Sequence, residues 1–233
     1  MCGRITQKTG ELPGLVTIMS DGRDSRIKTP PRYNGAPGQE HWVIRQNPET
    51  GERTRALLWW GLIAYWNKAT DGGRRPINAK AETVASLPTF RDAYQRRRCL
   101  LPIDNFFEWK AKGAKTKQPY AIALQSGEPF ALAGIWENWK RPSTGEWVRT
   151  FCVITCPANE LVADIHDRMP VIIPPESYDH WLSTLDPDPR GLLVPFPAAA
   201  MKMWPISARV NKPENDDEAI LEPVEVQDVP SLL

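Results

Sequence analysis

The stretch VRTFCVITC, residues 148–156, is rich in apolar and β-branched side chains, and its second half predicts a buried β-strand. Similar short runs recur along the chain, and Gly, Pro and Asn punctuate them. These runs are EHWVIR (40–45), RALLWWGLI (55–63), RCLLPI (98–103), QPYAIAL (118–124), FALAGIW (130–136), MPVIIP (169–174) and MKMWPIS (201–207). Their number and spacing favour a fold dominated by β-strands.

Helical patterns are fewer and shorter than the strand patterns. The best candidates are residues 86–97, 157–166 and 175–182, and the last begins with a proline where a helix tolerates one. A long series of strands broken by isolated helices is typical of an α+β fold with a largely antiparallel sheet. No segment resembles an interdomain linker, so we expect a single domain. Residues 20–31 and 67–76 have the composition of mobile loops.

The composition indicates a globular protein with a full core, since 41% of the 233 residues are hydrophobic and 24% are charged. No apolar run approaches the eighteen or so residues of a membrane span. The N-terminus also lacks the basic and apolar regions of a signal peptide. We therefore expect a cytoplasmic protein that has no membrane partner.

The charges are unevenly distributed. Residues 213–233 contain seven acidic residues and neither Lys nor Arg, so the preceding 212 residues hold all 29 basic residues against 21 acidic ones. A basic body followed by an acidic segment is compatible with a polyanionic ligand. A solvated surface explains such charge runs equally well.

Three of the four cysteines are predicted to be structural. Cys152 and Cys156 belong to the apolar run, and their spacing with Cys99 fits neither a zinc site nor a redox pair. We expect these three to be reduced thiols, and we expect no metal or cofactor. Cys2 differs because it directly follows Met1.

Removal of Met1 would give Cys2 an α-amine beside its thiol. An α-amine titrates near 7.7–8.0, so about a tenth or more of it is uncharged at neutral pH. The amine can attack an aldehyde to form an imine, and the thiol can close onto the imine carbon to give a five-membered thiazolidine. The same pair also suits acyl transfer with the thiol as the nucleophile. An incidental cysteine is the simpler alternative.

Polar residues elsewhere are candidate partners for this chemistry. Asn78, Lys80 and Glu82 alternate in INAKAET, so they face one way if the segment is extended. Glu108 stands between two aromatic residues, which predicts a partly desolvated carboxyl with a raised pKa that can shuttle protons. His166 follows a predicted helix. Each of them also has an ordinary structural explanation as a turn residue, an edge-strand charge or a helix cap.

Seven sequence blocks, taken together and in this order, resemble a known protein family, although no single residue is sufficient for that. They are MCGR (1–4), RYNGAPGQ (32–39), WGLIAYW (60–66), INAKAET (77–83), FFEWK (106–110), AGIWE (133–137) and IHDRMPV (165–171), with Thr155 eleven positions before His166. This set resembles the SRAP family of abasic-site processing proteins. The resemblance covers residues 2–226 and implies one SRAP domain with a barrel-like antiparallel core, followed by a short tail at 227–233.

The resemblance implies a protein that bonds covalently to abasic sites in single-stranded DNA during the SOS response. The opened abasic sugar presents an aldehyde, as the Cys2 chemistry requires. By its motifs, the family assigns crosslinking to Cys2, positioning of the terminus to Asn78, proton transfer to Glu108 and assistance of sugar ring opening to His166. It also implies a self-processing peptidase activity that exposes Cys2 and a lyase activity on DNA.

The same blocks predict the DNA contacts. Arg4, Asn34, Lys80 and Thr155 are candidates for phosphate or sugar contacts, and Trp66 and Trp109 are candidates for stacking on bases. Many family members carry arginine where this chain has Lys80, which holds a phosphate as a point charge without a two-pronged contact. We expect a monomer, associated with the nucleoid if the chain is bacterial.

Two other functions compete with this interpretation. Class II glutamine amidotransferases also use an N-terminal cysteine, but here Arg4 and ITQ (5–7) follow instead of their usual continuation. A noncatalytic module that binds single-stranded DNA would bind in a salt-dependent way and form no covalent product.

Overall fold

The computed structural model describes residues 2–19, 30–47, 49–113 and 116–226. The predicted tail at 227–233 and most of the predicted loop at 20–31 lie outside these ranges. The strands are β1 (Ile5–Gln7), β2 (Ile18–Met19), β3 (Arg32–Gly35), β4 (Glu40–Gln46), β5 (Arg53–Trp60), β6 (Asn78–Lys80), β7 (Arg98–Ile103), β8 (Asn105–Ala111), β9 (Lys117–Leu124), β10 (Phe130–Lys140), β11 (Trp147–Pro157), β12 (Arg168–Pro170), β13 (Ile172–Ile173) and β14 (Met201–Pro205). The α-helices are α1 (Arg91–Arg96), α2 (Glu160–Ala163) and α3 (Tyr178–Leu182). Single 3-10 turns are η1 (Pro175–Ser177), η2 (Arg190–Leu192), η3 (Ala198–Ala200), η4 (Ala208–Asn211) and η5 (Glu218–Leu221).

The larger sheet closes on itself through β11. Its strand order is β12-β11-β10-β7-β4-β5-β2, and β11 also pairs with β5, so β11, β10, β7, β4 and β5 form a closed ring. The ring pairings are antiparallel except for β11 with β5, which is parallel. The α+β fold with a barrel-like antiparallel core is therefore confirmed.

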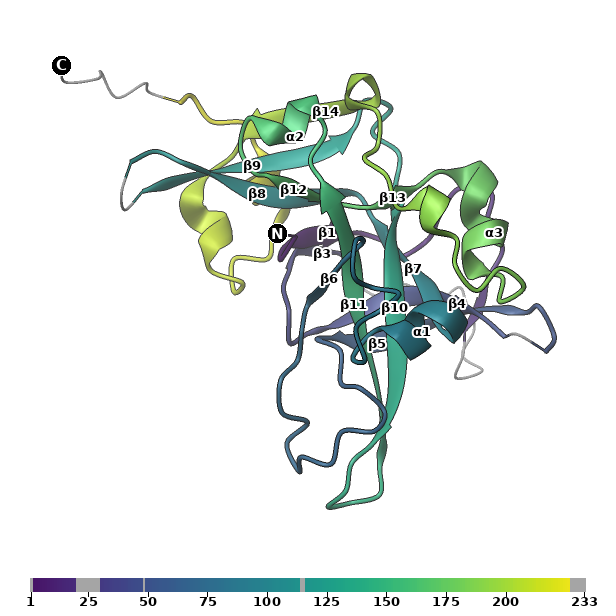
Figure 1. The fold of residues 1–233 in the computed structure, drawn as a ribbon. Helices are drawn as coiled ribbons and strands as arrows, with labels where there is room; N and C mark the ends of the chain where they lie inside the picture. Colours follow the sequence, from purple (N-terminus) through teal and green to yellow (C-terminus); the bar gives the residue numbers. More distant parts are fainter. Residues whose placement is uncertain (1, 20–29, 48, 114–115, 227–233) are drawn as a thin grey trace.

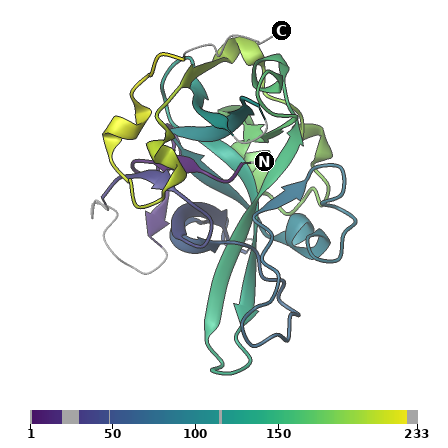
Figure 2. The same ribbon diagram turned by 90° about the vertical axis from the view of Figure 1, so that its left-hand side faces the viewer.

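The smaller sheet carries the N-terminus. Its order is β14-β9-β8-β1-β3, and every pairing in it is antiparallel. In Figure 1, β1 lies at the centre of the molecule, close to β3 and β6. The hairpin β10–β11 extends away from the body as a long arm, with the loop after β5 beside it (Figures 1 and 2).

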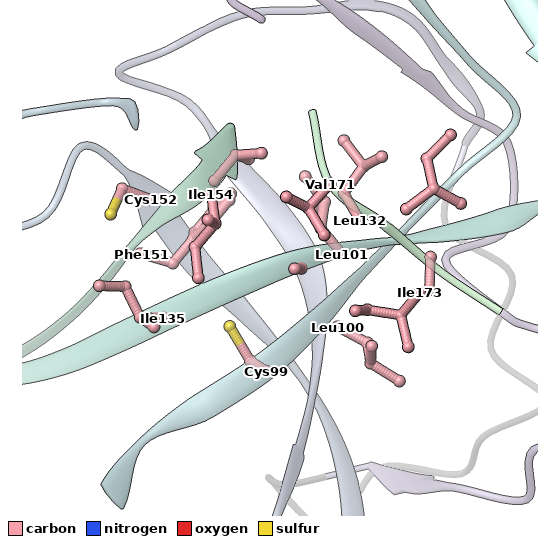
Figure 3. Close-up of a cluster of buried hydrophobic side chains, with 14 of the residues drawn as sticks. Cys99, Leu100, Leu101, Leu132, Ile135, Phe151, Cys152, Ile154, Val171 and Ile173 are labelled. Atoms are coloured by element: carbon pink, nitrogen blue, oxygen red, sulfur yellow. The ribbon is translucent and has the colours of Figure 1, made fainter. Parts of the chain in front are cut away.

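Apolar side chains from the ring strands fill the main core. Figure 3 shows Leu100, Leu132 and Phe151 on β7, β10 and β11, and all three are fully buried. Cys99, Cys152 and Cys156 are buried and unbridged, as predicted for structural thiols. Burial of each large apolar side chain contributes about 1.5–3 kcal/mol, so this core supplies most of the driving force for the fold.

Most predicted strands are confirmed, with differences at their ends. The run 98–103 is β7, whereas β10 continues beyond residue 136 to Lys140 in the hairpin arm and β11 begins at Trp147, directly before the predicted run. The run 169–174 divides into β12 and β13. Each predicted helix contains a helical segment, but α1, α2 and α3 span at most six residues. The Asn159 side chain accepts a 2.9 Å hydrogen bond from the Val162 N–H at the start of α2, as an N-cap does.

The segment 67–76 contains neither helix nor strand, as predicted for a loop, and the block RYNGAPGQ (32–39) combines a strand with a turn. RYNGAPGQ begins with strand β3, and only the turn at Pro37 and Gly38 is a loop, with Gly38 at a φ of +79°. The segment 67–76 is pinned at its start, because the Asn67 side chain donates to Gly72 O and the Trp139 indole donates to Asn67 O, both at 2.7 Å.

The acidic C-terminal segment packs against the basic body. Asp216 accepts hydrogen bonds from the backbone N–H groups of Tyr33 and Asn34 at 2.6 and 2.8 Å, and Asp217 pairs with Arg209. Part of the charge asymmetry is therefore neutralised within the molecule. Within the described ranges, no helix is long and apolar enough to cross a membrane.

Candidate functional site

Sheet register brings the N-terminus to Glu108. Ile5 of β1 pairs with Phe106 of β8, and the Phe107 N–H donates to Arg4 O at 3.0 Å. Because the strands run antiparallel, continuing this register toward the N-terminus carries Cys2 past Glu108. Two residues that are 106 positions apart in sequence are neighbours for this reason.

Asn78 holds the N-terminal segment from the other side. It opens β6, which pairs in parallel with β11 so that Asn78 lies opposite Val153. Its side-chain Nδ2 donates to Cys2 O at 2.8 Å, while its Oδ1 is buried without a hydrogen-bond partner in the described structure. A buried amide oxygen without a partner is costly, so it provides an acceptor for a ligand donor.

The Cys2 thiol is buried in this form of the chain, in which Met1 still precedes it. Burial raises the pKa of the Cys2 thiol well above its ordinary value, and the Glu108 carboxylate raises it further. The backbone N–H of Arg4 acts in the opposite direction. A neutral, enclosed thiol is a poor nucleophile.

Glu108 is buried, and burial raises its pKa above the ordinary value, against the lowering effect of nearby His166. The direction of the predicted shift is confirmed, but its predicted cause was wrong. Phe107 and Trp109 belong to a small cluster on the other face of β8, whereas Phe106 packs in the main core. Glu108 thus shares the inward face with Phe106, as alternation along a strand requires.

His166 follows α2 and lies close enough to Glu108 to affect its charge. Its Nδ1 accepts the Arg168 N–H at 3.0 Å and lies 3.0 Å from Asp167 Oδ1. The imidazole is half-buried, so it is oriented by the backbone and still reached by solvent. Cys2, Asn78, Glu108 and His166 therefore form one centre.

A groove of about 400 Å³ opens beside this centre. Its lining includes Trp66, Asn78 and Lys80, together with Arg74 and Thr83. Lys80 is exposed, and 51% of the Trp66 side chain is accessible. We call this the reactive groove. It places an aromatic ring and cations next to Asn78, the residue that holds Cys2.

The matching family model carries the description "SOS response associated peptidase (SRAP)" and covers residues 1–213 of the chain. The chain belongs to the SRAP family. The protein named Abasic site processing protein YoqW, from Bacillus subtilis, is 41% identical over 196 residues, which is 82% of this chain and 86% of that protein. Abasic site processing protein YedK of Escherichia coli is 29% identical over 96% of this chain and 100% of its own.

The fold is also that of a solved structure. An X-ray crystal structure of a protein from Bacteroides thetaiotaomicron superposes with a TM-score of 0.82 at 26% identity, covering 96% of this chain and 100% of that one. The ring of strands and the smaller sheet that holds the N-terminus therefore describe an SRAP domain.

In this SRAP chain, Asn34, a predicted DNA contact, lies inside the protein. Its side chain is fully buried; Nδ2 donates to Lys212 O and Asn215 O at 2.9 Å, and Oδ1 accepts from Arg4 at 2.7 Å. All its polar atoms are used within the protein. Asn34 thereby binds the C-terminal segment to β3.

Arg4 and Trp109 also bind the C-terminal segment. The Arg4 guanidinium, half-buried, donates to Val210 O at 2.6 Å and lies 6.0 Å from the Trp109 ring centre. The Trp109 indole donates to Asn211 Oδ1 at 2.7 Å. One guanidinium nitrogen of Arg4 and the indole N–H of Trp109 therefore bind the 207–216 segment.

Thr155, another predicted DNA contact, is buried as well. Its Oγ1 accepts a 3.3 Å hydrogen bond from Arg168 Nε. Arg168 additionally donates to Thr155 O, and its two terminal nitrogens bind both Glu82 carboxylate oxygens at 2.8 and 2.9 Å. Arg168 thereby joins β12, β11 and the turn after β6.

Arg168 is the residue that sequence reasoning missed. It lies inside IHDRMPV, two positions after His166, so the signal was present. Arg168 reaches Thr155 and Glu82 because β11 pairs with both β6 and β12, and no local sequence pattern shows these pairings. Within the described ranges, no three His, Cys, Asp or Glu side chains are grouped as metal ligands are.

Proposed function

We propose that this protein senses abasic sites in single-stranded DNA and captures them covalently through Cys2 after Met1 is removed. The observation that carries the proposal is the hydrogen bond from Asn78 to Cys2 O, which joins the N-terminal cysteine to the reactive groove beside buried Glu108. Membership of the SRAP family, and relatives named abasic site processing proteins, support it.

The chemistry balances without a cofactor. The Cys2 amine attacks the aldehyde carbon of the opened sugar, and the carbinolamine loses water to give an imine. The thiol sulfur then adds to the imine carbon while its proton passes to nitrogen, which closes the thiazolidine. The product equals protein plus DNA minus one water.

Glu108 and His166 have the proton-transfer roles in this scheme. A carboxyl whose pKa is raised by burial holds a proton more readily than an exposed one and can therefore act as an acid. Glu108 carries protons during carbinolamine dehydration and its reversal, and His166 assists opening of the sugar ring. Asn78 holds the terminus, and its buried Oδ1 is an acceptor for a sugar hydroxyl.

Noncovalent binding precedes the reaction. Trp66 offers a face for a base and Lys80 a charge for a phosphate, and both line the reactive groove. We further propose that a lyase reaction on the abasic strand and a self-processing peptidase step use the same centre. In this proposal the protein acts as a monomer in the cytoplasm, in the nucleoid of a bacterium.

The test uses an oligonucleotide with one abasic site. Wild-type protein whose N-terminus is verified as Cys2 is incubated with it, denatured and resolved by gel electrophoresis. We expect a heat-stable adduct that is lost in Cys2→Ala and in protein that retains Met1. If the verified wild-type protein gives no adduct, the proposal fails. Salt-dependent binding alone would favour a noncatalytic module, and glutamine hydrolysis would favour an amidotransferase.

A further inference from the structure

A second groove lies against the reactive groove and shares one wall with it. Along residues 74–80, Arg74 and Asn78 line the reactive groove, whereas Arg75 and Ile77 line the second. An extended chain directs alternate side chains to opposite sides in this way. The second groove has a volume of about 730 Å³, and β5 and the hairpin β10–β11 form its other walls. We call it the hairpin groove.

Two tryptophans are exposed in the hairpin groove. Trp59 of β5 is 44% exposed and Trp147 of β11 is 58% exposed, although most of the large apolar side chains of the ring strands are buried. Leu57 lies on the same outward face of β5 as Trp59. Exposed aromatic side chains gathered in a groove mark a binding surface, and planar rings suit planar ligands.

The charge of the groove favours an anion. Arg141 pairs with Glu146 at 2.9 Å, which leaves Arg75 and Arg149 against Glu40. In the part of the chain that the structure describes, the Arg149 guanidinium makes no hydrogen bond or ion pair. It lies on the same face of β11 as Trp147, two residues along the strand.

We propose that the hairpin groove binds a flanking segment of the same DNA strand, with bases on Trp59 and Trp147 and phosphates at Arg75 and Arg149. This rests on the proposed function, because the strand is the one whose abasic site reacts at Cys2. Aromatic rings beside guanidinium charges suit nucleotides better than a protein surface, and Arg75 keeps its charge while it donates to Asp71 O. The shared wall allows one strand to occupy both grooves.

The experiment measures affinity for two oligonucleotides that contain a non-reactive abasic analogue, one of about 20 nucleotides and one of about five. The variants are Trp147→Ala and Arg149→Ala, with Trp147→Phe as the conservative replacement. Arg96→Ala on α1 and Leu185→Ala are controls, since both residues are exposed outside the groove. Unchanged melting temperatures establish that the variants are folded.

We expect Trp147→Ala to raise the dissociation constant for the long oligonucleotide roughly 5- to 100-fold and to leave that for the short one unchanged. Trp147→Phe retains most of the affinity, and Arg149→Ala lowers the slope of log K against log salt by about 0.7. Wild-type affinity of both groove variants for both lengths would overturn the inference, and would point to a partner other than DNA.

Adduct formation separates this inference from the proposed function. At saturating DNA that contains a true abasic site, Trp147→Ala and Arg149→Ala are expected to react as completely as wild type. Absence of adduct in wild type counts against the Cys2 chemistry, whereas unchanged long-strand affinity in the variants counts against the hairpin groove alone.

Discussion

Asn78 is the residue that links the N-terminal segment to the reactive groove. Its amide nitrogen binds Cys2 O at 2.8 Å, and its neighbours Ala79 and Lys80 are held in β6 by the pairing with β11. The position of the terminus therefore depends on one side chain that belongs to a different sheet.

Replacement of Asn78 by Ala should lower the rate of adduct formation roughly 100-fold, because a reacting group displaced by about 1 Å loses that much. The measurement is a single-turnover rate at saturating DNA. Asn47→Ala is the matched control, since that side chain only caps its own turn. A wild-type rate in Asn78→Ala would contradict the positioning role.

Glu108 carries a pH dependence with a definite sign. Burial raises the pKa of its carboxyl, so between the unfolded and folded pKa values the folded state binds more protons, and stability falls as pH rises. Because glutamine does not titrate, Glu108→Gln removes this loss of stability with rising pH. The melting temperature of Glu108→Gln relative to wild type should therefore increase by a few degrees between about pH 4.5 and pH 8, since about 1 kcal/mol corresponds to 2–4 °C in a chain of this size.

Calorimetry of the two proteins across that pH range makes the comparison, and adduct formation by Glu108→Gln should be severely reduced. A constant difference in melting temperature at all pH values would contradict a buried, titrating Glu108.

At the scale of single residues, the sequence predicted which residues form the centre better than it predicted what surrounds each of them. Glu108 was expected to be desolvated, and it is, but by the inward face of β8 and not by its sequence neighbours. Asn34 and Thr155 were assigned to DNA because the motif contains them; in the structure both side chains are buried and form hydrogen bonds within the protein. Sequence cannot tell a motif residue that touches the ligand from one that supports the site.

Strand β11 is the element on which the site is built. It closes the ring by pairing with β5. It also pairs with β6, which begins at Asn78, and with β12, which follows His166 in the chain. Arg168 locks these neighbours together through Thr155 and Glu82.

Arg168→Ala should destabilise the protein by about 2 kcal/mol, or roughly 4–8 °C in melting temperature, because it breaks the Glu82 pair and leaves Thr155 O without its side-chain donor. Arg190→Ala removes only an exposed pair with Asp188 and should leave the melting temperature nearly unchanged. Thermal unfolding of the two variants tests this. Equal losses would mean that Arg168 makes no special bridge.

Element types followed from sequence, but pairings did not. Apolar and β-branched runs fixed the long strands, whereas β1, β2 and β6 are three residues or shorter and form only because neighbouring strands supply their partners. The parallel contacts of β11 with β5 and β6 join segments far apart in the chain. Such long-range pairing leaves no local periodicity to detect.

At the scale of the whole molecule, the N-terminus lies between the body and the acidic C-terminal segment. Asp216 fastens this segment to β3, and Arg4 fastens it to β1.

Asp216→Ala should lower the free energy of unfolding by about 1–3 kcal/mol, because two backbone N–H groups lose their acceptor. Asp217→Ala is the neighbouring control, since Asp217 makes only an exposed pair with Arg209. Denaturant unfolding distinguishes the two. Similar losses in both variants would mean that the acidic segment is held by charge alone.

The central claim is that Cys2 bonds to the abasic aldehyde through both its amine and its thiol. Intact mass and peptide mapping of the adduct, with and without borohydride, test it most directly. We predict a mass of protein lacking Met1 plus DNA minus one water, located at Cys2, and no gain of hydrogen on borohydride treatment because a thiazolidine has no imine to reduce. An adduct on another residue, or one at Cys2 that borohydride reduces fully while its thiol remains open to alkylation, would contradict the account.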